Sequence, residues 1–406
     1  MYRLLVKRDK LIYTVWMQTA VFLKKGKEKV LHQRHHWVFS GAIDSFPKSF
    51  VDGDLAPVFS YANELLGHGY FNRKASLCGR MVSFGSDDPK ETISQNIKNA
   101  LTLRSSLFRP SETGYRLIHG EGDLLPGLIV DRYGDYLVIQ ISTLGMDRLK
   151  SFILSCLTSL IPVKGIYEKS LLPSRKEEGM EPFEGNLFGE LKELIEIEEN
   201  GSKFLVSYQK GQKTGFFLDQ REMRKEIASL ACGKRLLNCF CYTGGFSVAA
   251  LKGGAAVVDS IDISKEAIEM VKANFLLNGL DTEKNNIITD DVTKFLRSAT
   301  SLPYDIVILD PPAFAKKKQD VIPACKGYKE INRQAMQKMP PNSLLLTCSC
   351  SYHVDESLFQ KVLFQAASDA NRQIKIIGRH ILSPDHPINL YHPEGSYLKS
   401  FLLYVQ

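Results

Sequence analysis

The sequence contains no apolar run approaching the roughly 18 to 20 residues that a transmembrane helix needs, so a membrane protein is not expected. Its eight cysteines include no Cys-x-x-Cys pair and are not spaced in the regular pattern of a disulfide framework. This excludes the disulfide-rich secreted class. Reduced thiols therefore predict a cytoplasmic protein. Internal repeats and low-complexity segments are absent as well.

Two nucleotide-binding signatures are also missing, namely the Gly-x-Gly-x-x-Gly of nicotinamide sites and the Gly-x-x-x-x-Gly-Lys-Ser/Thr loop of triphosphate sites. A glycine turn nevertheless follows the predicted strand 235–240, in the stretch 241–247 that reads CYTGGFS. Because glycine has no Cβ, such a turn lets the backbone approach a ligand closely. The turn predicts a nucleotide-type pocket that makes little provision for phosphate.

Carboxylates follow the next two predicted strands. Asp262 lies 17 positions beyond Gly245, where it can accept hydrogen bonds from both ribose hydroxyls, and Asp291 could accept one from an adenine amino group. Two carboxylates would repel a diphosphate but suit a nucleoside with a cationic sulfur. S-adenosylmethionine is therefore the cofactor indicated, although turn glycines and surface aspartates would explain either signal alone.

The length of 406 residues predicts two or three domains. Residues 1–19 are expected to be an extension that precedes the first domain, with Met17 as the true start and residues 1–16 as a mis-assigned start. Short strands broken by turns predict a small β module over 20–90, and 91–205 are expected to form an α+β domain. From 206 to 406 the alternation of strands and amphipathic helices predicts a parallel α/β sheet.

The net charge of +7 is unevenly distributed, since residues 1–80 hold 13 Lys and Arg against 6 Asp and Glu. A basic module on a neutral body indicates a polyanion partner, and solvated lysines would account for the charge equally well. The segment 32–37 adds three histidines and Trp37, which could contact phosphate and stack on a base. The acidic stretch 177–199 is predicted to be a solvated face.

Two motifs carry the chemistry. The fourth strand of the predicted sheet ends in Asp310-Pro-Pro-Ala-Phe314, where α/β sheets bind their ligands. The next strand ends in two cysteines, Cys348 and Cys350. A thiolate can add to carbon 6 of cytosine and make carbon 5 accept a methyl group. The two thiols could instead pack in the core or form half of a zinc site.

The zinc site is disfavoured by spacing. Cys239 and Cys241 end one strand as Cys348 and Cys350 end another, but structural zinc prefers two to four residues between paired cysteines. We therefore expect no metal.

The stretches NCFCYTGGFS, DPPAFAKKK and TCSCSYHVDES resemble class I methyltransferases that form 5-methylcytosine in ribosomal RNA. The whole chain from about residue 20 is most similar to the family whose members act on large-subunit RNA and carry an N-terminal PUA domain. GQKTGFFLDQREMR and DHPINLYHPEGSYLKSF are among the motifs that carry this resemblance. It implies a Rossmann-like domain with a mostly parallel seven-stranded sheet, S-adenosylmethionine as cofactor and ribosomal RNA as partner, with a homodimer allowed.

The resemblance also assigns residues. In RNA cytosine methyltransferases the nucleophile is followed as Cys-Ser-x-x-x-acid-acid, a register that fits Cys350 with Ser351 and does not fit Cys348. Cys350 and Asp310 are the expected catalytic residues. The expected cofactor-binding residues are Asn238, Tyr242, Thr243, Gly244, Gly245, Asp262, Asp291 and Asp310.

The chain departs from related enzymes at two places. Asn238 stands where many relatives carry Asp, and Pro312-Ala313 stands where another branch carries a Pro-Cys that assists release. Two alternative functions stay open: a ribosomal RNA guanine-N methyltransferase of the same fold, which needs no thiol, and a non-catalytic RNA-binding assembly factor.

Overall fold

The computed structural model describes residues 18–406, so the predicted extension lies outside the described residues except for its last two positions. The chain folds into two compact units, each built from three segments. Unit 1 comprises the described residues up to Ile195 with Ser207–Phe216 and Pro384–Gly395, and unit 2 the remainder from Glu196 onward. Within residues 18–406 no helix has the length and apolarity that crossing a membrane would require.

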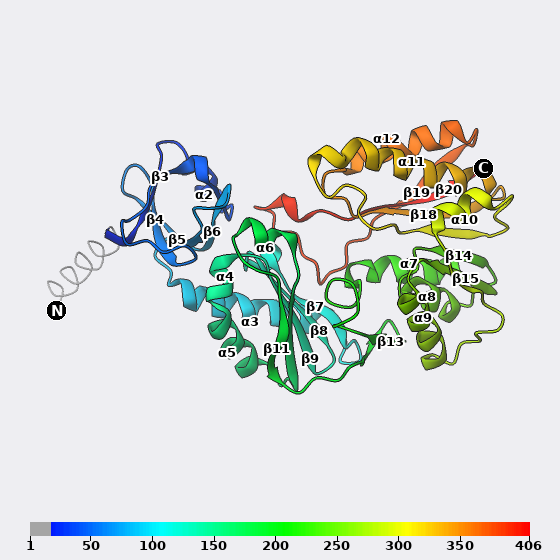
Figure 1. Ribbon diagram of the computed structural model, residues 1–406, viewed down its shortest axis with the longest axis horizontal. Helices are drawn as coiled ribbons and strands as arrows, with labels where there is room; N and C mark the ends of the chain where they lie inside the picture. Colours follow the sequence, from blue (N-terminus) through cyan, green and yellow to red (C-terminus); the bar gives the residue numbers. More distant parts are fainter. Residues whose placement is uncertain (1–17) are drawn as a thin grey trace. The chain divides into compact units, whose positions relative to one another are not determined.

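Unit 1 begins with a six-stranded sheet, drawn in blue in Figure 1. Its strands, in sheet order, are β2 (Trp37–Phe39), β6 (Leu77–Phe84), β5 (Leu65–Phe71), β4 (Leu55–Phe59), β1 (Val21–Leu23) and β3 (Ile43–Ser45). All its neighbouring strands pair antiparallel except β1 with β4. The short helix α2 (Lys29–His32) adds Leu31 to the apolar cluster that the sheet encloses.

A five-stranded sheet and four helices complete the larger part of unit 1. The strands, in sheet order, are β11 (Phe183–Gly189), β10 (Gly165–Ser170), β9 (Tyr136–Ile141), β8 (Leu128–Tyr133) and β7 (Gly114–His119). The helices are α3 (Pro89–Leu107), α4 (Leu144–Arg148), α5 (Lys150–Leu160) and α6 (Pro173–Glu177). Asp88 caps α3 by accepting from the backbone N–H groups of Lys90 and Glu91.

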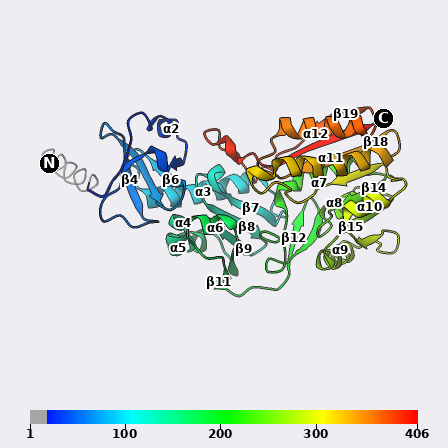
Figure 2. The same ribbon diagram turned by 45° about the horizontal axis from the view of Figure 1, so that its top comes forward.

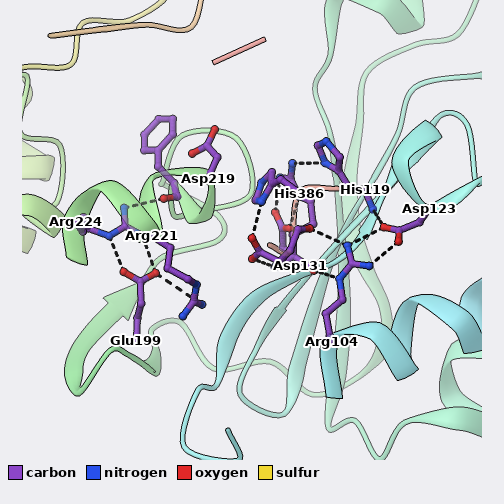
Figure 3. Close-up of polar contacts among 12 residues, drawn as sticks. Arg104, His119, Asp123, Asp131, Glu199, Asp219, Arg221, Arg224 and His386 are labelled. Carbon is purple, nitrogen blue, oxygen red and sulfur yellow. Dashed lines mark hydrogen bonds and ion pairs between the residues drawn. The ribbon is translucent and has the colours of Figure 1, made fainter. Parts of the chain in front are cut away.

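Polar anchors tie the two later segments to unit 1. The Arg104 guanidinium donates to the Asp385 carbonyl over 2.8 Å and forms a two-pronged ion pair with Asp123, which Figure 3 shows. Thr214 Oγ1 donates to Asp131 over 2.6 Å. The Lys169 ammonium donates to backbone carbonyls of the loop 207–216, at 2.6 Å for Tyr208. Charge-assisted bonds of this kind are stronger than neutral ones, so they define where both segments dock.

Unit 2 contains the mostly parallel seven-stranded sheet, which confirms the fold implied by the resemblance. In sheet order its strands are β16 (Ile287–Thr289), β15 (Val257–Asp262), β14 (Arg235–Cys239), β17 (Ile306–Leu309), β18 (Ser343–Ser349), β20 (Lys399–Val405) and β19 (Ile374–Arg379). β20 runs antiparallel to both of its neighbours. The carboxyl ends of β14, β15, β17 and β18 therefore meet at one edge.

Helices cover both faces of this sheet. They are α7 (Arg221–Leu230), α8 (Gly245–Lys252), α9 (Lys265–Leu277), α10 (Val292–Ser298), α11 (Val321–Lys338) and α12 (Glu356–Asp369). Leu237 and Cys239 of β14 pack in a cluster with α10, α11 and α12, whereas Leu236 packs in another with α7 and α8. Figure 2 shows α11 and α12 side by side along one face. The alternation follows from the two-residue period of strands.

Most carboxylates of the acidic stretch 177–199 are exposed to solvent, as predicted, and Glu178 and Glu199 are the two exceptions. The stretch contains β11 and the whole of β12 (Ile195–Glu199), which pairs with β13 (Ser202–Val206). Glu178 in unit 1 accepts from Arg80, and Glu199 in unit 2 accepts two bonds from Arg224, as Figure 3 shows. Both carboxylates are buried. Composition alone does not reveal them, because the arginine partners lie far away in the sequence.

Candidate active site

The turn between β14 and α8 holds three residues in the left-handed backbone region. Their φ angles are +59° at Phe240, +48° at Tyr242 and +82° at Gly244. Glycine adopts this conformation freely, but each of the two bulky residues stores about 1–2 kcal/mol of strain. Strain of this kind concentrates at binding and catalytic sites. The turn that the sequence singles out is therefore also the place where the backbone of this domain is strained.

Asp262, at the end of β15, is fixed against this turn. One of its carboxylate oxygens accepts from the Tyr242 N–H over 2.9 Å and the other from the Ser264 N–H over 3.0 Å. The carboxylate is only half-buried, and each oxygen has a further lone pair. Asp262 thus combines a fixed position with remaining capacity to accept hydrogen bonds from hydroxyl groups.

Two predicted cofactor residues are buried at this end of β14, Asn238 in the strand and Thr243 in the turn. The Asn238 amide donates to Ser247 Oγ over 2.9 Å, and that hydroxyl lies 2.8 Å from Ser260 Oγ. Asn238 Oδ1 and Thr243 Oγ1 are buried and have no partner among the described residues. Leaving a buried polar atom unpaired costs about 1–3 kcal/mol. A polar ligand that formed hydrogen bonds with these two atoms would remove this cost.

Asp291 occupies the N-cap of α10, where Oδ1 accepts from the Lys294 N–H over 2.9 Å. It follows β16, whose Thr289 pairs with Asp262 of β15. Asp262 and Asp291 therefore lie at the same edge of the sheet, as predicted from the order of strands. Within the described residues, no lysine or arginine stands in the turn 240–247.

This set of residues fits S-adenosylmethionine better than a phosphate-bearing nucleotide. It offers acceptors at Asp262 and Asp291, orphaned polar atoms at Asn238 and Thr243, and a glycine at position 244 that opens the turn. Carboxylates favour hydroxyl and amino donors and a cationic sulfur, and they repel phosphate. The eight predicted cofactor residues stay a prediction, but the structure places the members from β14, β15 and the turn together.

Asp310 follows β17, the strand next to β14, and is half-buried. The Gln220 amide donates to Asp310 Oδ2 over 3.1 Å. Gln220 itself is buried in η3 (Leu218–Gln220), and its Oε1 has no partner in residues 18–406. Gln220 lies within the motif GQKTGFFLDQREMR, but the sequence does not predict its role, because no rule of spacing connects it to a position 90 residues away.

The two cysteines of β18 differ sharply in their surroundings. Cys348 is fully buried in the cluster with α7 and α8, and burial together with the Asp310 carboxylate raises the pKa of its thiol well above the usual range. Cys350 is half-buried just beyond the strand, where its thiol lies 3.8 Å from the Pro311 carbonyl. A buried neutral thiol is a poor nucleophile. Of the pair, Cys350 is the one placed beside the Asp310-Pro311 turn.

Ser351 anchors the loop that carries Cys350. Its hydroxyl oxygen accepts from the Ala315 N–H over 3.0 Å and lies 2.9 Å from the Tyr328 hydroxyl. Its carbonyl accepts from the Lys399 ammonium over 2.7 Å. The loop after β18 is therefore joined to the loop after β17, to α11 and to β20. The sequence assigns no roles to Tyr328 and Lys399, because their bonds to Ser351 join segments that are distant in the chain.

The zinc arrangement is not supported by the geometry of the cysteines. Cys239 packs in the cluster with α10, α11 and α12, whereas Cys348 packs in the cluster on the opposite face of the sheet. Thiols on opposite faces cannot share one tetrahedral ion.

A second cluster of ligand-type side chains lies in unit 1 and was not predicted. The ligand atoms of His35, His392 and Glu394 all lie within 4.8 Å of one another. His35 Nδ1, however, accepts from the Trp37 N–H over 3.1 Å, so neutral His35 carries its proton on Nε2, the atom 3.4 Å from Glu394. The cluster is thereby explained as a hydrogen-bonded contact of residues 384–395 with the first sheet.

Comparison with protein families gives two matches. The family described as S-adenosylmethionine-dependent methyltransferase matches residues 181–388. The family described as a PUA-like domain matches residues 21–84, the part of unit 1 that forms the six-stranded sheet.

Curated relatives match nearly the whole chain. A protein of Aeromonas hydrophila named Ribosomal RNA large subunit methyltransferase I is 41% identical over 397 residues, which cover 95% of this chain and 99% of the relative. A protein of the same name from Escherichia coli O9:H4 is 39% identical over 394 residues, covering 95% and 99%.

Solved structures agree with this. A solved structure that is described as a methyltransferase complexed with SAH has a TM-score of 0.82 and 27% identity. The match covers 95% of this chain and 99% of that one. A chain from Streptococcus mutans, assigned as a SAM-dependent methyltransferase, has a TM-score of 0.80 and 26% identity with the same coverage.

Proposed function

Because the chain belongs to the family of S-adenosylmethionine-dependent methyltransferases, we propose that it methylates carbon 5 of a cytosine in large-subunit ribosomal RNA through a covalent bond to Cys350. The observation that carries this proposal is the contrast between the two thiols that end β18. Cys350 is half-buried beside the Asp310-Pro311 turn, whereas Cys348 is sealed in the core.

The substrate class rests on the relatives and on the first sheet of unit 1. Relatives that match 95% of the chain are named for the large subunit of ribosomal RNA. The PUA-like match at residues 21–84 lies in the basic part of the sequence and holds nine of the 13 Lys and Arg of the first 80 residues. Positive charge of this kind binds the phosphates of RNA without regard to sequence.

The reaction begins when the target cytosine leaves its stack, since its ring carbons are shielded in a paired helix. The Cys350 thiolate forms a bond to carbon 6, and the electron pair of the C5–C6 double bond makes carbon 5 nucleophilic. Bound S-adenosylmethionine supplies an electrophilic methyl group on a sulfonium, and S-adenosylhomocysteine is the product. Loss of the proton from carbon 5 re-forms the double bond and breaks the carbon–sulfur bond, which returns the thiolate.

Asp310 is the second proposed catalytic residue. Asp310 directly precedes Pro311, whose carbonyl lies 3.8 Å from the Cys350 thiol, so we expect its side chain beside the ring that the thiol attacks. A protonated Asp310, or a water held by it, can hydrogen-bond the ring nitrogen edge and stabilise the charge that develops when sulfur adds. Gln220 donates to Oδ2 and thereby fixes the orientation of the carboxyl group.

The decisive experiment uses RNA that contains 5-fluorocytosine. Fluorine at carbon 5 leaves no proton to lose, so the enzyme–RNA adduct persists and is seen as a shifted band on a denaturing gel. We expect the wild type to form the adduct with S-adenosylmethionine present, and Cys350→Ser to form none. Cys232→Ser, which removes an exposed thiol elsewhere, is the matched control and keeps the adduct.

Three outcomes would overturn the proposal. An adduct that survives in Cys350→Ser would place the nucleophile at another residue. A Cys350→Ser enzyme that retains full turnover on unmodified RNA would favour the guanine-N methyltransferase, which needs no thiol. Failure of the wild type to bind S-adenosylmethionine by calorimetry would favour the assembly factor. Nucleoside mass analysis of the product identifies the methylated base in each case.

A further inference from the structure

Lys399, the first residue of β20, has its ammonium buried next to the loop of Cys350. Its exposed fraction is 6%, and its Nζ donates to the Ser351 carbonyl over 2.7 Å and to the Tyr397 carbonyl over 2.6 Å. Ser351 directly follows Cys350, so the ammonium holds the peptide unit adjacent to the thiol.

A buried lysine without an ion pair is unfavourable, because removing an ammonium from water costs several kcal/mol. Within the described part of the chain no carboxylate forms an ion pair with Lys399, and two backbone carbonyls are its hydrogen-bond partners. Strands whose only task is packing use apolar residues at such positions. The burial of a cation here therefore indicates a functional task.

The electrostatics connect this cation to the thiol. Burial lowers the pKa of Lys399 to about 8, while the charges of Cys350 and Asp355 act in the opposite direction. The interaction between two groups is reciprocal: a Cys350 thiolate favours the Lys399 ammonium, and the ammonium favours the thiolate equally. Below pH 8 the lysine is charged, so it supplies this effect at neutral pH.

The neighbouring titratable groups do not supply a positive charge. Tyr328 on α11 and Cys348 on β18 are neutral, since burial raises the pKa of each. Asp310 after β17 and Asp355 at the N-cap of α12 bring negative charge, which disfavours a second anion.

We infer that Lys399 is a positioning residue for the methyl transfer, whose ammonium holds the Ser351 peptide unit and makes the thiolate the favoured form of Cys350. The inference rests on the proposed function, in which that thiolate is the nucleophile. It deepens that function by naming the group that activates the sulfur. The cysteine and aspartate motifs of the sequence contain no residue assigned to that task.

The test is the pH dependence of thiol alkylation in the full chain. Iodoacetamide reacts with the thiolate, and mass spectrometry of the peptide that contains Cys350 follows this thiol separately from the others. We expect the alkylation midpoint of the wild type to lie below the ordinary thiol value of about 8.5. In Lys399→Met the midpoint should rise by about one pH unit, with an approximately tenfold slower reaction at pH 7.

Lys338→Met is a matched control. The Lys338 ammonium also donates to two backbone carbonyls, those of Leu296 and Arg297, but it lies in another part of unit 2 and has no interaction with Cys350. The Lys338→Met substitution also removes an ammonium that binds backbone carbonyls, and we expect it to leave the pH profile of Cys350 alkylation unchanged. Affinity for S-adenosylmethionine, measured by calorimetry, should be unchanged in both variants, which shows that each has folded.

The outcomes separate this inference from the proposed function. An unchanged profile in Lys399→Met, or a wild-type midpoint at or above 8.5, would overturn the role of Lys399. The second criterion needs no variant, so it holds even where Lys399→Met does not fold. If the profile shifts as expected but 5-fluorocytosine RNA forms no adduct, the proposed function fails while the electrostatic influence of Lys399 on Cys350 stands.

Discussion

The hydroxyl of Ser351 joins the two loops that carry the candidate nucleophile and its neighbour. It accepts from the Ala315 N–H and lies within hydrogen-bond distance of the Tyr328 hydroxyl, and all three groups are buried. The side chain touches no part of the expected cofactor site. Its contribution to the reaction is therefore expected through the position of Cys350.

Ser351→Ala should lower the turnover number by about tenfold to a hundredfold, because the loop of Cys350 would lose its tie to Ala315. The buried N–H left without an acceptor should also lower the free energy of unfolding by about 1–3 kcal/mol. Steady-state methylation and urea titration measure the two effects.

Ser343→Ala is the matched control for this change. Ser343 is likewise a buried serine but begins β18, at the end opposite to the Ser351 loop, and its hydroxyl donates to the Pro340 carbonyl. The control should lose stability without a comparable loss of turnover. Equal losses of turnover in the two variants would show that Ser351 does not position the thiol.

Lys399 should also leave a mark on stability at high pH. Its pKa is lowered to about 8 by burial, so between pH 8 and its ordinary value near 10.5 the unfolded chain binds the proton more tightly than the folded chain. The free energy of unfolding should rise with pH across this window, by roughly 3 kcal/mol relative to Lys399→Met. Below pH 8 the difference should be constant. Denaturant titrations of both proteins from pH 7 to 10.5 check this, and a flat difference would contradict it.

For single residues, the sequence indicates a candidate role only where the residue belongs to a motif. Cys350 was favoured over Cys348 by its register with Ser351, and the structure gives these two cysteines the different burial that the choice requires. Gln220 and Lys399 were not found. Their roles depend on hydrogen bonds to Asp310 and to the Ser351 carbonyl, and residue periodicity contains no information on such long-range pairs.

Strands and helices of unit 2 agree closely with the sequence-based ranges, since their apolar periodicity is strong. The strand expected over 235–240 is observed as β14. The apolar spacing of residues 265–278 predicts a helix, and the structure has α9 there. In unit 1, the apolar spacing of residues 146–160 predicts one helix, but the structure has two helices, α4 and α5, that meet at Leu149. An apolar pattern passes through such a junction without interruption, so the break leaves no signal.

The glycine turn makes an element-scale prediction. Gly244 has φ of +82°, and a Cβ at this position would lie 3.1 Å from a methyl carbon of Val271. Gly244→Ala should therefore destabilise the turn through strain of about 1–2 kcal/mol together with this close contact, and it should lower the affinity for S-adenosylmethionine at least tenfold. Calorimetric titration measures the affinity.

Gly233→Ala is the matched control, because it introduces backbone strain without a close contact of the new Cβ. Gly233 has φ of +70°, but a Cβ there would meet no atom within 4 Å. It carries the same kind of backbone strain and lies at the opposite end of β14. We expect a similar loss of stability with unchanged cofactor affinity, and an equal loss of affinity in both variants would contradict the role of the turn.

At the scale of the whole molecule, the chain enters unit 1 three times. The segments 207–216 and 384–395 belong to it by their contacts, although both are surrounded in sequence by unit 2. The sequence-based boundaries at 20–90, 91–205 and 206–406 stay a prediction, and boundaries of that contiguous kind cannot express such returns. Thr214 with Asp131 and Arg104 with Asp385 are the contacts that fix them, and each joins residues far apart in the chain.

His119 provides a test of unit 1 as a whole. Burial lowers the pKa of His119 well below its usual value, and the positive charges of His386, Arg116 and Arg104 act in the same direction against Asp385. Figure 3 shows His119 and His386 close together. The unfolded chain binds this proton near pH 6.5 and the folded chain does not, so stability should fall as pH drops below 6.5, by up to about 1.4 kcal/mol per unit.

Hydrogen exchange of β7 and of residues 384–395 between pH 7.5 and 5.5 measures this loss within unit 1. His119→Gln, which keeps a polar side chain but has no group that titrates here, should show a weaker dependence on pH. The same slope in the variant and the wild type would show that another group controls the acid response.

The returns of the chain to unit 1 have a consequence for how the protein is made. A ribosome finishes the first two sheets of unit 1 early, but the backbone N–H of Arg116 and the guanidinium of Arg104 meet their Asp385 acceptors only after nearly all of unit 2 has been translated. The part that is begun first is thus completed last. A truncated transcript that ends before residue 384 would yield a chain without the segment 384–395, so its unit 1 would stay incomplete.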